Sequence, residues 1–135
     1  MNLRPFLLLL ALAALIHRSC AQRTFDATIG DTTYHMKQYW FVLYTRGADT
    51  TALDSATSAA MLKAHLEHQQ AQSDRGLIVM AGPFGDKGDW RGLLLYDCDT
   101  REEVEGYLRQ DPFVKAGRLS YEIHPWYGAV GTRLP

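Results

Sequence analysis

His65 is the first residue of this chain whose type and surroundings suggest acid–base chemistry. It lies where apolar residues recur at spacings of three and four, which predicts a helix with a narrow apolar stripe of Met61, Leu62, His65, Leu66 and Gln69. An imidazole in that place is either a core histidine bonded to a backbone carbonyl or a proton-transfer group. The stripe alone leaves both interpretations open.

Asp111 is the second such residue. It follows Leu108 by three positions, so it continues the inward face of a second predicted helix, and it precedes Pro112. A carboxylate there must be paired, protonated or used as a cap, and Asp before Pro often starts a turn. If Asp111 and His65 instead line one cleft, the carboxylate fixes the imidazole tautomer. The histidine then becomes a base for proton transfer next to a carbonyl, as in a lactone isomerase or a dehydrohalogenase-type lyase.

The segment Gly76–Asp97 predicts a hairpin at the centre of a sheet, with a loop more polar than a turn requires. Two apolar runs, Leu77–Ala81 and Leu93–Tyr96, flank a glycine-rich connection that carries carboxylates and cations. Loops held by a rigid sheet often build binding sites, although a solvated loop has the same composition. The candidates for substrate binding are the cations Arg46, Arg91 and Lys115, which suit a carboxylate, together with Tyr44 and Asp86.

A metal site is the competing interpretation of the first histidine, because His65 and His68 are spaced as two ligands on one helix. A catalytic zinc needs a third ligand, which would have to come from His35 or His124. His68 lies one step round the helix, where we expect it to face solvent. We therefore predict no metal site and no cofactor. The glycines of the long loop do not open a helix, which argues against a nucleotide site.

The N-terminus of this 135-residue chain indicates export. Arg4 precedes the apolar run Phe6–Ile16, which is short for a membrane span, and Ser19-Cys20-Ala21 offers small residues at the cleavage positions. We expect a signal peptide, residues 1–21, and a periplasmic or secreted mature protein without membrane contact. A retained membrane anchor is the less favoured alternative.

The mature chain is mildly acidic and holds a single cysteine. Loss of Arg4 and Arg18 with the signal peptide takes the formal net charge from −1 to −3, which argues against a nucleic-acid partner. Cys20 is lost as well, so Cys98 cannot form an internal disulfide. We expect Cys98 to be a small buried hydrophobe at a strand end, in preference to an intermolecular link or a reactive thiol.

The order of the predicted elements is β-α-β-β-α-β, after a loosely packed N-terminal arm at residues 22–38 and within a domain at residues 39–135. A strand at Tyr39–Tyr44 and a helix ending near Asp74 precede the hairpin, and a helix opened by Thr100 and a strand at Leu119–Tyr127 follow it. This order predicts an α+β, ferredoxin-like fold, in which two helices cover one face of a four-stranded antiparallel sheet.

The uncovered face of that sheet is expected to be apolar. The first strand is apolar on both faces, so the open face shows Trp40, Val42 and Tyr44 or their neighbours. An open antiparallel face is normally polar, so we expect a second copy of the chain to pack there and form a homodimer.

Several short motifs together resemble the YciI-like (YCII-related domain) family. They are His65-Leu66, AGPFGD at Ala81–Asp86, Arg91-Gly92, DPFVKAGRL at Asp111–Leu119 and EIHPWYG at Glu122–Gly128. The resemblance spans about Tyr39 to Gly128 and implies a ferredoxin-like fold that forms a dimeric α+β barrel, similar to muconolactone isomerases. It also implies an acid–base pair at His65 and Asp111. The first-strand aspartate of many members is absent, because Tyr44 is followed by Thr45-Arg46.

Three functions are compatible with these features. The first, favoured by the resemblance, is a small exported lyase or isomerase that uses His65 as base and Asp111 as its partner on a small cyclic or aromatic acid. The second is a non-catalytic dimeric module that binds a small molecule. The third is an interaction protein that uses its open sheet face or Cys98.

Overall fold

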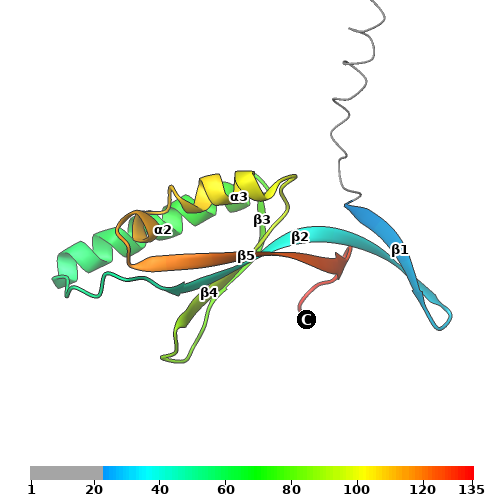
Figure 1. Cartoon of the computed structure of the whole chain (residues 1–135), viewed down its shortest axis with the longest axis horizontal. Coiled ribbons are helices and arrows are strands. Elements are labelled where there is room, and N and C mark those ends of the chain that lie inside the picture. The colour runs from blue at the N-terminus through cyan, green and yellow to red at the C-terminus, as the bar shows by residue number, and fades with distance from the viewer. Residues whose placement is uncertain (1–22) are drawn as a thin grey trace, which may run out of the picture.

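The structure, a computed structural model, describes residues 23–135 (Figure 1). The expected signal peptide and its cleavage site, residues 1–21, lie outside the described residues. No helix in the described part is long and apolar enough to cross a membrane. The elements in chain order are β1 (Thr24–Ile29), β2 (Thr32–Arg46), α2 (Ser55–Asp74), β3 (Ile78–Pro83), β4 (Trp90–Tyr96), α3 (Arg101–Leu108), α4 (Pro112–Lys115) and β5 (Leu119–Ala129).

Strand β2 is the centre of an antiparallel sheet. Along residues 36–46 it pairs with β5 on one edge, and on the other edge it pairs with β4 at residues 40–45 and with β1 at residues 32–37. Strand β3 pairs with the outer edge of β4. The order β5-β2-β4-β3 is that of the predicted βαββαβ arrangement, and Figure 1 shows α2 and α3 on the same side of the sheet. The predicted α+β, ferredoxin-like fold is confirmed.

The core lies between the sheet and the helices. Val42, Tyr44 and Tyr96 are buried against Val104 and Leu108 of α3. Because side chains alternate along a strand, the open face of β2 carries the neighbours of these residues, at positions 39, 41 and 43. In Tyr39–Tyr44 both sets of alternate residues are apolar, so the sequence did not show which set faces the helices. The structure places Trp40, Val42 and Tyr44 on the covered side.

The described part of the N-terminal arm is a β-hairpin made by β1 and the first part of β2, a regular structure that the prediction of a loosely packed arm did not include, and most of its side chains are exposed. Strand β1 alternates apolar and polar residues, and Gly30 turns the chain into β2 with a φ of 60°. The hairpin extends away from the helical layer (Figure 1). Its base is held by Arg23, whose guanidinium lies 2.6 Å from carboxylate oxygens of both Asp97 and Asp99.

Local capping explains where the helices begin and end. The predicted capping box opens α3, where the Thr100 hydroxyl accepts from the Glu103 amide and the Glu103 carboxylate accepts from the Thr100 amide. Helix α2 ends before Gly76, which has a φ of 73°. The Asp111-Pro112 pair predicts a turn, whereas the segment after Asp111 forms the short helix α4.

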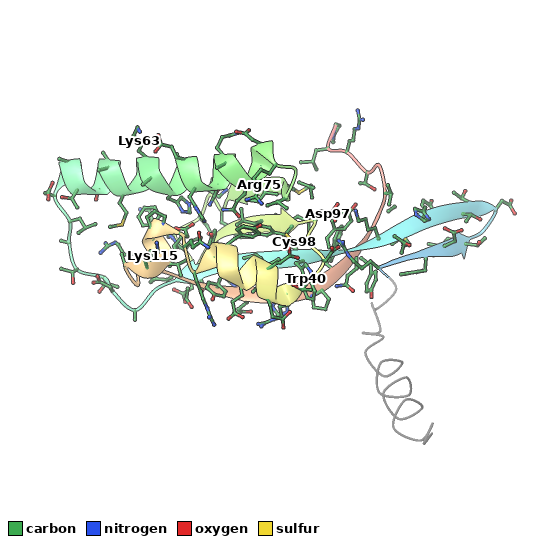
Figure 2. The ribbon with its side chains drawn as sticks, turned by 90° about the horizontal axis from the view of Figure 1, so that it is seen from above. Trp40, Lys63, Arg75, Asp97, Cys98 and Lys115 are labelled. Atoms are coloured by element: carbon green, nitrogen blue, oxygen red, sulfur yellow. The ribbon has the colours of Figure 1, made fainter. Side chains whose placement is uncertain are left out.

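Cys98 is buried in the core, as predicted. Figure 2 shows it near Trp40, whose indole N–H donates to the Cys98 carbonyl oxygen at 3.2 Å. Burial, together with the nearby Glu103 carboxylate, raises the pKa of the Cys98 thiol to about 11. The thiol is therefore protonated at neutral pH and behaves as a small hydrophobic side chain.

Candidate active site

A cavity of about 720 Å³ lies between α2 and the sheet. Helix α2 packs loosely over this space, since Leu62 and Leu66 remain about half exposed while lining it. The remaining wall comes from β2, β3, β4, the segment at residues 49–50 and the α4–β5 connection. A cavity of this volume suits a small-molecule ligand.

His65 and Asp111 meet at the wall of this cavity. The two side chains are joined by a 2.7 Å hydrogen bond between His65 Nδ1 and Asp111 Oδ2. The Tyr44 hydroxyl donates to the same carboxylate oxygen at 2.9 Å, and the Phe113 amide donates to Oδ1 at 2.8 Å. Asp111 is completely buried and is both the N-cap of α4 and the hydrogen-bonding partner of the histidine. The carboxylate is therefore both paired and used as a cap, two of the roles that the sequence left open.

The surroundings of Asp111 keep its carboxyl group ionised. Burial alone would raise its pKa, but the hydrogen bond and charge of His65, with the Tyr44 hydroxyl and the Phe113 amide, hold the pKa below its ordinary value. Burial and the negative charge of Asp111 raise the pKa of Tyr44 far above its usual range. Tyr44 therefore stays protonated and serves as a donor to Asp111.

These protonation states fix the tautomer of His65. An ionised carboxylate only accepts hydrogen bonds, so Nδ1 carries a proton and donates to Asp111. On the other side of the ring, the Gln69 side-chain nitrogen lies 2.9 Å from His65 Nε2. An amide nitrogen only donates, so Nε2 accepts from it. The basic lone pair of a neutral imidazole thus lies on the Nε2 side, next to a residue that lines the cavity.

Three arginines among residues 23–135 supply positive charge to the cavity wall. Arg46 Nε lies 3.4 Å from Asp89, and Arg118 lies 3.8 Å from Asp49. Arg91 forms no ion pair with any other described residue. It is therefore the cavity-lining arginine whose charge is least compensated by a neighbouring carboxylate, and it suits a ligand carboxylate.

The segment between β2 and α2 is fastened to the α4–β5 connection. The Gly47 and Asp49 amides each donate to backbone carbonyls there, at 2.9 Å. A Cβ at position 47 would lie 2.0 Å from the Gly117 carbonyl oxygen, so the close approach requires glycine. Arg118 donates to the Thr51 carbonyl oxygen at 2.8 Å. These contacts hold Asp49 and Thr50 at the cavity wall.

Five of the residues predicted for the site come together and two do not. Tyr44, Arg46, His65 and Arg91 line the cavity, with Asp111 buried behind His65. Asp86 and Lys115 are corrections, because both are exposed outside it. Asp86 accepts from the Gly88 amide at 3.4 Å and stabilises its own loop, and Lys115 lies in the last turn of α4 (Figure 2).

The sequence interpretation missed Gln69 and Arg118 as site residues. Gln69 lies on the apolar stripe one helical turn after His65. Because a polar residue that faces inward often belongs to a functional site, this position was a signal that could have identified it. Arg118 follows a turn, and no local pattern indicates that it returns to the segment before α2.

His68 is a further correction, because it does not face solvent. It is half-buried, and its Nε2 donates to the Tyr107 carbonyl oxygen at 2.9 Å, which ties α2 to α3. His35 pairs with Asp26, and His124 pairs with Glu122. Within residues 23–135, no three His, Cys, Asp or Glu side chains gather in a way that could hold a metal ion.

Comparisons with known proteins give a family match and a similar solved structure. The sequence model of the YCII-related domain matches residues 39–127. One similar solved structure is 5-chloro-2-hydroxyhydroquinone dehydrochlorinase (TftG) from Burkholderia phenoliruptrix AC1100, in complex with 2,5-dihydroxybenzoquinone. It is 19% identical, with a TM-score of 0.43, over 64% of this chain and 92% of that chain. Similarity at this level says nothing of the reaction. Comparison with curated protein sequences gives no match.

Proposed function

This chain belongs to the YCII-related domain family, and we propose that it is a small exported enzyme, a lyase or isomerase, that moves a proton on a small cyclic or aromatic acid. The observation that carries the proposal is the contact series from Tyr44 through Asp111 to His65 at the wall of the cavity. A buried ionised carboxylate behind a histidine is the arrangement that a general base needs.

In the proposed reaction, His65 Nε2 removes a proton from a ring carbon next to a carbonyl. The electron pair of the broken C–H bond moves into the ring, and Asp111 stabilises the imidazolium that forms. An isomerase returns the proton to another carbon, whereas a lyase lets the electron pair expel a leaving group. Tyr44 stays protonated and keeps the Asp111 carboxylate in place.

The cavity wall suits a carboxylated ring. Arg91 provides a cation for the carboxylate, in the same wall as His65. Leu62, Leu66 and Phe113 line the cavity with apolar surface for the ring. The ring of Phe113 also lies edge-on to His65 at 4.9 Å between centroids, which restricts the orientation of the imidazole.

The test of the proposal does not require the natural substrate. The protein is incubated in D₂O with a panel of cyclic and aromatic carboxylates that have a C–H bond next to a carbonyl, and deuterium uptake is followed by NMR. We expect exchange above the buffer rate for the members that bind. If panel compounds bind but none exchanges, the result would contradict the proposal of an enzyme. It would favour the alternative of a non-catalytic module that binds a small molecule.

Arg91→Gln is expected to weaken the binding of a carboxylate from that panel by about 10–100-fold, the loss for one charge-assisted hydrogen bond at roughly 1.4–2.7 kcal/mol. Isothermal titration calorimetry measures it. Lys115→Gln is the matched control, because it removes the same charge from an exposed position outside the cavity. Equal effects of the two variants would mean that only overall charge matters.

We also propose that the protein is a homodimer joined through the uncovered face of its sheet. That face carries the aromatic and aliphatic side chains of Tyr39, Phe41 and Leu43, and Figure 1 shows α2 and α3 on the opposite side. Leu43 is already buried in the single chain, so burial of the partly exposed Tyr39 and Phe41 provides the driving force, at about 25 cal/mol per Å² of apolar surface.

Phe41→Glu is expected to raise the dimer dissociation constant by about 100-fold or more, because it buries an unpaired charge in the interface. Analytical ultracentrifugation measures the constant. Lys63→Glu on the outer side of α2 (Figure 2) is the control and should leave it unchanged. A wild-type monomer at micromolar concentration would contradict the proposal.

A further inference from the structure

The Gln69 side chain forms a hydrogen bond with His65 Nε2, the atom that removes the proton in the proposed reaction. The Gln69 side-chain nitrogen lies 2.9 Å from His65 Nε2, and both residues line the cavity. The two residues are four apart on α2, which places their side chains on the same face of the helix. The basic lone pair of His65 therefore accepts a hydrogen bond from the protein itself, and a substrate must displace that bond before its proton is removed.

A carboxamide is suited to both protonation states of the ring. Its NH₂ end can only donate and matches the lone pair of the neutral imidazole, whereas its carbonyl end can only accept and matches Nε2–H of the imidazolium. The two ends exchange places by a half-turn about the last side-chain bond. Asp111 accepts from Nδ1 in both states, since its pKa is held low by its partners. Protonation therefore changes the hydrogen bonding on the Nε2 side of the ring, where the Gln69 side chain also interacts with the Tyr44 hydroxyl.

We propose that Gln69 is a positioning residue whose carboxamide turns with the protonation of His65, donating from its NH₂ end to neutral Nε2 and accepting through its carbonyl oxygen from Nε2–H of the imidazolium. This inference rests on the proposed role of His65 as the base. The proton moves from the substrate carbon to Nε2, and the electron pair of that C–H bond stays on the substrate. Gln69 then stabilises the new N–H until the proton returns.

Several charged groups also act on His65. Asp111 from the start of α4 favours the imidazolium, and the positive charges in the cavity wall oppose it. The titratable groups that face the ring or line the same cavity are Tyr44, Arg46, Asp49, Arg91, Asp111 and Arg118. Gln69 is the uncharged hydrogen-bonding partner of Nε2, so its variants change the hydrogen bonding there while these charges stay in place.

The decisive variant is Gln69→Leu, followed by ¹⁵N NMR titration of the His65 ring in the full mature chain. A carboxamide that turns supports both states, so its removal should move the protonation midpoint of His65 by less than about 0.5 pH unit. A carboxamide fixed with its NH₂ end on Nε2 supports the neutral ring alone. Its loss should then raise the midpoint by about 1 unit or more, and that result would overturn the proposal.

A second variant, Gln69→Glu, tests the contact itself. A carboxylate at this place accepts from Nε2–H and favours the imidazolium, so His65 should take up its proton at a pH higher by about 1 unit or more. Gln70→Glu is the matched control: it adds the same charge one residue further along α2, at an exposed position whose amide bonds to Asp74. Equal shifts in the two variants would refute a direct contact between Gln69 and Nε2.

A direct readout in the wild type completes the test. A ¹⁵N–¹⁵N coupling across the Gln69–His65 hydrogen bond should be present where His65 is neutral and absent where it is protonated. In the exchange assay, the acidic limb of the pH profile for Gln69→Glu should move upward with the titration. If no panel compound exchanges, the proposed enzyme fails while the His65 titrations still decide the role of Gln69.

Discussion

Replacing His65 with glutamine is expected to reduce deuterium exchange into any panel compound by about 10²–10⁴-fold, the range that a single general base contributes. Glutamine is similar in length and can donate to Asp111, so the buried carboxylate keeps a partner. It has no basic lone pair, so the chemical step loses its proton acceptor. Substrate affinity, measured by calorimetry, should fall much less, because the arginines and the apolar walls of the cavity remain in place.

His68→Gln is the control for this variant. His68 lies on the same helix and is half-buried, but its ring bonds to the Tyr107 carbonyl oxygen instead of facing Asp111. Its replacement should leave exchange within a factor of a few of the wild-type rate. If the His65→Gln variant keeps most of the exchange activity, another group is the base, and the proposed mechanism is refuted.

Asp111→Ala is expected to lower the free energy of unfolding by about 3–5 kcal/mol, the range for removal of one partner from a buried pair. The carboxylate has no exposure to solvent and accepts from the His65 ring, the Tyr44 hydroxyl and the Phe113 amide. Alanine leaves these donors without an acceptor. Urea denaturation at pH 7 measures the change. Asp54→Ala, which removes the exposed N-cap of α2, should cost less.

The pH dependence of that difference follows from the lowered pKa of Asp111. The folded protein holds the carboxylate in its ionised form more firmly than the unfolded chain does, so its stabilising effect is fully present above about pH 4, the ordinary value of an aspartate. The effect is lost as the pH falls through the lower folded value. The gap between wild type and Asp111→Ala should therefore narrow below pH 4. A constant gap down to about pH 2 would show that Asp111 does not act through its charge.

Most of the fold follows from local signals in the sequence. The capping box at Thr100, the glycine after α2 and the Asp-Pro pair each fixed the end of an element, because they satisfy backbone groups without help from distant residues. The run Tyr39–Tyr44 identified a strand but not which of its faces is covered. Both faces are apolar, and the choice depends on packing against α3.

The N-terminal hairpin has a local signal that the sequence interpretation did not use, whereas part of the site depended on contacts that no local pattern reveals. Strand β1 has the alternation of a half-buried strand, whereas the polar composition of residues 22–38 as a whole predicts a loosely packed arm. Arg118 reaches the cavity because Gly47 lets two distant segments approach closely. Asp86 and Lys115 have suitable charges, but the structure places both outside the cavity. Residue type and spacing thus made the histidine and the carboxylate candidates, the family resemblance favoured them as a pair, and tertiary packing selected their neighbours.

The double pairing of β2 determines which side of the cavity can move. From residue 40 to residue 45 each residue of this strand faces β4 on one edge and β5 on the other. Its amides should therefore exchange hydrogen only when the whole domain unfolds, and they include that of Tyr44. Helix α2 is largely exposed and has Gln72 as its one fully buried residue. We therefore expect that a slow opening of the cavity to a ligand is a motion of α2, while the sheet stays rigid.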